Sequence, residues 1–88
     1  MIRKHIVFTG RVQGVGFRWR ARQAALLYSY TGWCRNDWGG TVTMEIQGKE
    51  AAIGKVIRSL EAGRYIRIQN MDVTSMSPEP DERGFSTD

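Results

Sequence analysis

The chain has 88 residues, 41% of them hydrophobic and 25% charged, with a formal net charge of +4 at pH 7. A chain this short forms a single domain, over residues 1–88, and buries only about 60% of the surface that it exposes when unfolded. It contains no apolar run near the roughly 20 residues of a membrane span and no signal-peptide pattern, so we expect a cytoplasmic protein without membrane contact.

Apolar spacing predicts a strand and then a helix in the first part of the chain. Residues 5–9 alternate as in a strand, with Ile6 and Phe8 on one face. From Phe17 the apolar period becomes helical, and one face of this helix carries Phe17, Ala21, Ala24, Ala25 and Tyr28. We expect Gly32 to lie in the C-terminal cap region of the helix.

Two strands joined by a tight turn follow. They are expected over residues 33–38 and 41–47, and the turn is the glycine pair at residues 39–40. One face of the second strand is apolar and carries Val42, Met44 and Ile46. Its other face is polar, which predicts an antiparallel sheet with one hydrated face and helices on the other.

The second half of the chain predicts a helix and a long strand. The helical stripe lies between Lys49 and Gly63 and consists of Ile53, Val56, Ile57 and Leu60. Gly54 interrupts this helix, and we expect it to allow close packing on the sheet. The strand covers residues 66–76, with a bulge at residues 69–70 where the apolar phase shifts.

The C-terminal part is polar up to residue 82. Residues 77–82 are expected to form a solvated connector, and residues 83–87 are the single candidate for a short fifth strand. The predicted order β-α-β-β-α-β, with two helices on one face of an antiparallel sheet, is the ferredoxin-like α+β sandwich.

The most informative segment is the glycine-rich stretch from Gly10 to Arg18, GRVQGVGFR, between the first strand and the first helix. Glycines allow backbone N–H groups to approach a ligand, a helix start adds free donors, and an arginine supplies a fork of donors. These features favour a phosphate-like anion. The glycine spacing fits neither a Walker A loop nor a dinucleotide-binding fingerprint. The alternative is an ordinary turn followed by a solvated Arg18.

Basic residues dominate the part of the chain before the first acid, Asp37. Seven of them precede it: Arg3, Lys4, Arg11, Arg18, Arg20, Arg22 and Arg35. Such a charge distribution attracts anions, whether small phosphates or nucleic acid.

The glycine-rich segment meets every fixed position of G-x-V-Q-G-V-x-F-R, and the chain resembles the acylphosphatase family, hydrolases of acyl phosphates. Further matching elements are Gly32-Trp33-Cys34-Arg35-Asn36, Gly40-Thr41-Val42 and Gln47-Gly48. The resemblance covers residues 5–76 and weakens after Pro78. It implies the same ferredoxin-like plan with a short fifth strand. Residues 83–87, the candidate for that strand, form a shorter run than is usual in the family.

The resemblance also implies a mechanism without metal or cofactor. Arg18 and the backbone N–H groups of Gln13, Gly14, Val15, Gly16 and Phe17 would hold the phosphoryl group, and Asn36 would position the attacking water. A substrate oxygen would take the proton, because no strong base is present. We expect a monomer whose ligands are a small acyl phosphate and inorganic phosphate. We expect the Gln13 side chain to shape the loop, and no chemical step follows from it.

Several residues have simpler interpretations. Asn36, next to a glycine turn, is by itself typical of turn chemistry. We expect Cys34, the only cysteine, to be a core residue, and His5 and Arg35 to lie on the surface. The three tryptophans, Trp19, Trp33 and Trp38, are expected to pack in the core or at its rim.

Two other function classes remain open. A nucleic-acid-binding module with the same element order fits the basic charge, but the aromatic signature of RNA-recognition domains is missing from the central strand. A catalytically idle acylphosphatase-like domain with a regulatory role is the second alternative.

Overall fold

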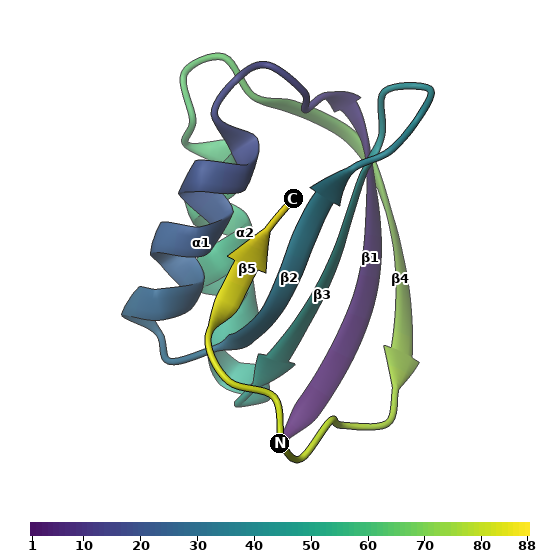
Figure 1. Ribbon diagram of the computed structural model, residues 1–88. Coiled ribbons are helices and arrows are strands. Elements are labelled where there is room, and N and C mark those ends of the chain that lie inside the picture. The colour runs from purple at the N-terminus through teal and green to yellow at the C-terminus, as the bar shows by residue number, and fades with distance from the viewer.

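The fold is a five-stranded sheet with two helices packed on one of its faces (Figure 1). The computed structural model describes residues 1–88. The elements in chain order are β1 (Ile2–Arg11), α1 (Phe17–Leu27), β2 (Thr31–Asn36), β3 (Val42–Gly48), a 3-10 turn (Glu50–Ala52), α2 (Ile53–Glu61), β4 (Arg67–Met76) and β5 (Phe85–Thr87). The strands lie in the order β4-β1-β3-β2-β5. This confirms the ferredoxin-like α+β plan and the short fifth strand.

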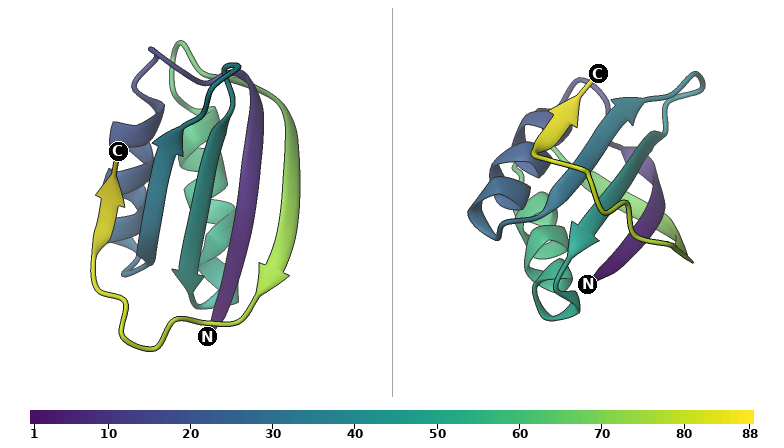
Figure 2. Two further views of the ribbon diagram at one scale, coloured as in Figure 1. Left: turned by 45° about the vertical axis from the view of Figure 1, so that its right-hand side comes forward. Right: turned by 60° about the horizontal axis from the view of Figure 1, so that its bottom comes forward.

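The expectation of a wholly antiparallel sheet needs one correction. β1 pairs antiparallel with β3 and β4, and β2 pairs antiparallel with β3, but β5 runs parallel to β2. The reason is visible in Figure 2, where the chain after β4 crosses to the opposite edge of the sheet before it enters β5. The C-terminal strand therefore ends beside the start of α1, at the same end of the molecule as the glycine-rich segment (Figure 1).

The core lies between the sheet and the helices and anchors the first residue of α1. Val42, Met44 and Ile46 of β3 are fully buried, as their alternation predicted. Phe17 packs edge to face on Phe8 of β1, with ring centroids 4.9 Å apart. Because Phe17 is fixed in the core, the position of the neighbouring Arg18 is fixed with it.

The phase shift in the last long strand is a bulge, as predicted. Thr9 pairs with Asn70 and Gly10 pairs with Ile68, so Gln69 has no partner on β1. At Gly10, where φ is +133°, a Cβ atom would collide with the carbonyl oxygen of Arg67. Gly10 is thus required by the close approach of β4 to β1 and not by the loop that follows.

Two other glycine interpretations were wrong. Helix α1 ends before Ser29, whose φ of +61° takes the left-handed conformation expected near Gly32. Gly32 instead lies inside β2, where a Cβ atom would collide with the carbonyl oxygen of Glu45. Gly54 is exposed on α2, so it does not bring the helix closer to the sheet.

The segment Ser77–Gly84, which we call the strap, is not the free connector that its composition suggested. It runs from the end of β4 past β1 and β3 to β5 (Figure 2) and is held by the outer face of the sheet. Glu82 pairs with the buried guanidinium group of Arg3 at 2.7 Å, and the Glu79 backbone exchanges hydrogen bonds with the Gln47 side chain at 2.6 and 2.9 Å. The outer face of β3 is less hydrated than predicted, because Gln47 is buried beneath the strap and Thr43 is buried where it donates to Asp37.

Glu45 completes this polar cluster and makes it sensitive to acid. Burial alone would raise the pKa of its carboxyl, but hydrogen bonds from His5 and Arg3 outweigh burial and hold the pKa below its usual 4.5. A carboxyl with a lowered folded-state pKa stabilises the fold above its unfolded pKa, and this contribution is lost as the pH falls through the folded pKa.

We therefore expect Glu45→Gln to lower the free energy of unfolding by about 1–2 kcal/mol at pH 7, because Arg3 loses a charged acceptor. As the pH falls below about 4.5 and then through the lower folded-state pKa, the gap between the variant and the unmodified protein is expected to close, since Glu45 is protonated first in the unfolded chain and then in the folded one. Urea unfolding at several pH values measures this gap. Glu50→Gln, at an exposed position, is the control, and a gap that stayed constant down to pH 3 would contradict the prediction.

Candidate functional site

The loop between β1 and α1 presents a cluster of free backbone donors. None of the backbone N–H groups of residues 13–19 donates a hydrogen bond within the protein. Gly14 and Gly16 have φ angles of +72° and +80°, and Gly16 caps α1 without any side-chain hydrogen bond. Free N–H groups at the positive end of a helix, next to a left-handed glycine loop, form a site for an anion.

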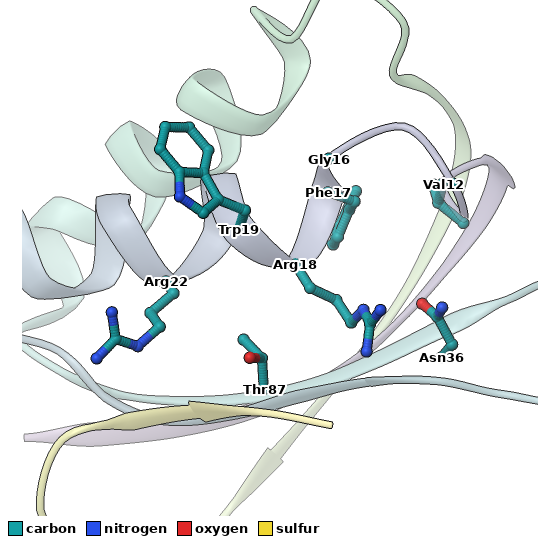
Figure 3. A pocket seen from close by; sticks show the side chains of 9 residues that line it. Val12, Gly16, Phe17, Arg18, Trp19, Arg22, Asn36 and Thr87 are labelled. Carbon is teal, nitrogen blue, oxygen red and sulfur yellow. The ribbon is translucent and has the colours of Figure 1, made fainter.

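A cavity of about 320 Å³ opens beside these donors. It lies where the loop, the first turns of α1, the end of β2 and the end of β5 meet (Figure 3). Its lining residues are Val12, Gly14, Gly16, Phe17, Arg18, Trp19, Arg22, Asn36 and Thr87. The lining contains two arginines and no carboxylate, so the cavity favours a negatively charged ligand.

Arg18 lies at the centre of this arrangement. Its side chain is partly exposed, and its guanidinium group points toward the side chain of Asn36 (Figure 3). None of the four ion pairs in the structure involves Arg18. A guanidinium group without a carboxylate partner keeps its donors available for a phosphate.

Asn36 is the last residue of β2 and faces the same side of the sheet as Cys34, two residues before it. Cys34 is fully buried under the helices, whereas Asn36 lies at the cavity. The turn that follows uses Asp37, which accepts hydrogen bonds from Thr41 at 3.0 Å and from Thr43 at 2.6 Å. The turn chemistry that was the simpler interpretation of Asn36 thus belongs to its neighbour.

The negative charge of Asp37 is held within this turn. Burial would raise the pKa of its carboxyl, but hydrogen bonds from Thr43, Thr41 and Arg35 outweigh burial and lower the pKa. Arg35 points away from the cavity, as strand alternation predicted, and pairs with Asp37 at 3.3 Å. The carboxylate of Asp37, the acidic residue nearest to Asn36 in the sequence, therefore binds partners in the turn and not a ligand in the cavity.

The side chain of Gln13 shapes the loop, as expected, but through contacts that the sequence did not indicate. Its amide nitrogen donates to the carbonyl oxygens of Asp37 and Thr41, both at 2.8 Å. One side chain thereby ties the glycine-rich loop to the β2–β3 turn. It fixes the distance between the loop donors and Asn36, although it does not line the 320 Å³ cavity.

We expect Gln13→Ala to lower kcat about tenfold with a smaller change in KM, because misplacing two parts of a site by a fraction of an ångström slows a positioned reaction. Gln13→Glu should be at least as harmful, since its carboxylate would face two carbonyl oxygens and cannot donate. Steady-state hydrolysis, measured alongside the Tm of each variant, checks this. Full activity in Gln13→Glu would show that the tie is dispensable.

The other sequence-based expectations have mixed outcomes. Val15 packs against the core and contributes only its backbone to the loop. Cys34 is buried as predicted, and burial raises the pKa of its thiol to about 12, so it is protonated at neutral pH. His5 is half-buried against Glu45, on the outer face of the sheet.

Two of the three tryptophans do not pack in the core or at its rim as expected, whereas Trp33 is half-buried on β2. Trp19 is 66% exposed and lines the cavity, and the side chain of Trp38 projects fully into solvent. Two further lining residues, Arg22 and Thr87, were not singled out by the sequence. Arg22 follows Arg18 by one helical turn, and that spacing was the available signal.

Comparisons with known proteins agree with this geometry. The acylphosphatase family model matches residues 4–87, so the match continues through the segment after Pro78 where the motif resemblance weakened. An acylphosphatase from Geobacillus thermodenitrificans is 41% identical over 86 residues, 97% of this chain and 92% of that protein. The crystal structure of the Bacillus subtilis acylphosphatase matches with a TM-score of 0.89 at 28% identity, covering 99% of this chain and 98% of that one. A full-length HypF in a phosphate- and nucleotide-bound form matches with a TM-score of 0.86 at 26% identity, and this chain covers 11% of it.

Proposed function

This chain belongs to the acylphosphatase family and hydrolyses acyl phosphates, and we propose that Arg18, the loop N–H groups and Asn36 perform the reaction without a metal ion. The observation that carries this proposal is the run of unpaired backbone N–H groups over residues 13–19 beside an arginine without a carboxylate partner. Such donors match the oxygens of one phosphoryl group.

The loop and Arg18 hold the phosphoryl group and stabilise its charge. The N–H groups of Gln13 to Phe17 donate to the phosphoryl oxygens from one side, and the Arg18 guanidinium donates from the other. In phosphoryl transfer the charge is spread over the three equatorial oxygens, and donors fixed around them favour the transition state. Because these donors are part of a folded loop and a helix start, they need little reorganisation when the substrate binds.

Asn36 positions the water that attacks the phosphorus atom. Its amide can donate to one partner and accept from another, so it orients a water molecule without changing its own charge. The water oxygen forms a bond to phosphorus while the bond from phosphorus to the acyl oxygen breaks, and the electron pair leaves with the carboxylate. A phosphoryl oxygen takes the water proton, so the products are a carboxylate and inorganic phosphate.

A metal ion has no evident role in this scheme. The donors that face the cavity are N–H groups, which bind anions, and the chain has no group of three or more His, Cys, Asp or Glu side chains placed to hold a metal ion. In the proposed mechanism, Arg18 and the loop N–H groups stabilise the negative charge on the phosphoryl oxygens.

The experiment is the hydrolysis of benzoyl phosphate by the purified chain with and without excess EDTA. We expect the same kcat/KM in both conditions, and no gain on addition of Mg²⁺, Mn²⁺ or Zn²⁺. A loss of activity in EDTA that one of these ions restores would contradict the metal-free part of the proposal while leaving acyl phosphate hydrolysis intact.

We also propose that small acyl phosphates, and not nucleic acids, are the ligands of a monomeric cytoplasmic protein. RNA-recognition domains stack bases on aromatic residues of the open sheet face. Here the strap lies across that face, held by the ion pair between Arg3 and Glu82 and by the hydrogen bonds between the Gln47 side chain and the Glu79 backbone. No helix of this chain is long and apolar enough to cross a membrane.

A further inference from the structure

The cavity is longer than a phosphoryl group requires. Gly14, Gly16, Arg18 and Asn36 define one end, where the proposed phosphoryl site lies. From there the lining continues along α1 to Arg22 and Thr87, and Thr87 lies between the two arginines in Figure 3. This second end is where the acyl part of a substrate bound at Arg18 would lie.

Arg22 is held at this end by the last strand. Its Nε donates to the carbonyl oxygen of Phe85 at 3.2 Å. Thr87 follows Phe85 by two residues on β5, so its side chain is on the same face of the strand and lines the cavity. A guanidinium group has five N–H donors, and with one of them used for Phe85 the others remain available.

The charge at this end is not neutralised. Arg22 takes part in none of the four ion pairs of the structure, and the cavity lining includes no Asp or Glu. The phosphoryl group already has Arg18 and the loop N–H groups as partners. A second unpaired arginine in the same cavity is therefore a binding group for a second negative charge.

Arg18 and Arg22 leave α1 one helical turn apart, about 6 Å along the helix axis. Their side chains extend in opposite directions, so the two guanidinium groups lie further apart than this and at opposite ends of the cavity (Figure 3). In an extended four-carbon acyl phosphate with bonds of about 1.5 Å, the far carbon lies about 6 Å from phosphorus. An anionic group on that carbon would lie toward the Arg22 end of the cavity while the phosphoryl group occupies the Arg18 end.

We propose that Arg22, with the hydroxyl of Thr87, forms an acyl-end subsite for a second anionic group, so that the preferred substrates are acyl phosphates with a carboxylate or phosphate at the far end. This rests on the proposed placement of the phosphoryl group at Arg18. Arg22 would then determine specificity and would take no part in the chemical step.

The test compares three acyl phosphates of similar length. Butyryl phosphate has an uncharged end, succinyl phosphate has a terminal carboxylate, and 3-phosphonopropionyl phosphate has a terminal phosphonate. We expect kcat/KM to be about tenfold higher for at least one of the two charged substrates than for butyryl phosphate, mainly through KM, after subtraction of uncatalysed hydrolysis. The better of the two identifies which anion the subsite takes.

Arg22→Gln is the diagnostic variant, and Arg20→Gln is its matched control. Arg20 lies on the same helix and also donates to a backbone carbonyl, that of Ser59 at 3.1 Å, but it is directed to α2 and does not line the cavity. Arg22→Gln should remove the preference for charged substrates, so that the ratio of their kcat/KM to that of butyryl phosphate falls to about one within the variant. Arg20→Gln should keep the preference, although it removes the same charge.

Three results would overturn the inference. One is equal kcat/KM for all three substrates in the unmodified protein. Another is an equal loss on all three substrates in Arg22→Gln with a lowered Tm, which would make Arg22 only a clamp between α1 and β5. The third is the same loss of preference in both variants, which would indicate long-range charge. Failure to hydrolyse any of the three substrates would instead overturn acyl phosphate hydrolysis itself, and this inference with it.

Discussion

Replacing Arg18 by glutamine is expected to lower kcat/KM for benzoyl phosphate by at least about 10³, because an arginine that stabilises the charge of phosphoryl transfer contributes factors of this order. Glutamine keeps much of the length but loses the charge and the planar fork of donors. Inorganic phosphate, as a competitive inhibitor, should bind far more weakly to the variant. Steady-state kinetics and phosphate inhibition constants measure both effects.

The fold should tolerate this change, which separates a catalytic effect from unfolding. Arg18 takes part in no ion pair, and its side chain is partly exposed, so Tm is expected to change little. Arg20→Gln removes the same charge two residues away and should retain nearly full activity on benzoyl phosphate. If Arg18→Gln kept more than a tenth of the activity, the phosphoryl group would have to lie elsewhere.

The parts of the fold that could be predicted from sequence depend on local spacing. The 3.6-residue period placed both helices, the alternation in β3 identified its buried face, and a break in alternation located the β4 bulge. These patterns reflect which side of an element meets the core, and each is complete within about ten residues. The glycine-rich loop was predictable for the same reason, since its donors come from consecutive residues.

The strap could not be predicted, because what holds it is distant in sequence. Arg3 meets Glu82 across 79 positions and meets Glu45 across 42. Nothing in a polar, proline-containing segment shows that one of its glutamates is the partner of a buried arginine near the other end of the chain. The tie between Gln13 and the β2–β3 turn escaped prediction in the same way, since it joins residues 24 and 28 positions apart.

The basic residues show most clearly that contacts between residues distant in sequence cannot be predicted from the sequence alone. The sequence places seven bases before the first acid, which suggests one continuous cationic surface. In the structure Arg3 is neutralised by Glu45 and Glu82, and Arg35 pairs with Asp37. The other five have no carboxylate partner, and two of these, Arg18 and Arg22, line the cavity. Folding therefore neutralises some of the basic residues and leaves unpaired positive charge at the site.

Asn36→Ala is the second change with a large expected effect. We expect kcat to fall by about 10²-fold or more while KM changes little, because losing a group that orients the attacking water slows the reaction without loosening the phosphoryl group. The pH profile should keep its shape, since an amide does not titrate. Single-turnover hydrolysis of benzoyl phosphate over pH 5–8 measures both the rate and the profile.

Asn36→Asp sharpens the test because it preserves size and changes charge. A carboxylate at this position could also orient a water molecule, but it would face the negative phosphoryl oxygens and oppose their binding. We therefore expect Asn36→Asp to raise KM as well as to lower kcat, most strongly at pH values where the new carboxylate is ionised.

Asp37→Asn, one residue further on, is the control. The Asp37 carboxylate accepts hydrogen bonds from Thr41, Thr43 and Arg35, so its loss should weaken the turn and lower Tm with a smaller effect on kcat. If Asn36→Ala instead lowered Tm with unchanged kcat, Asn36 would be a turn residue, and the water would need another group to position it.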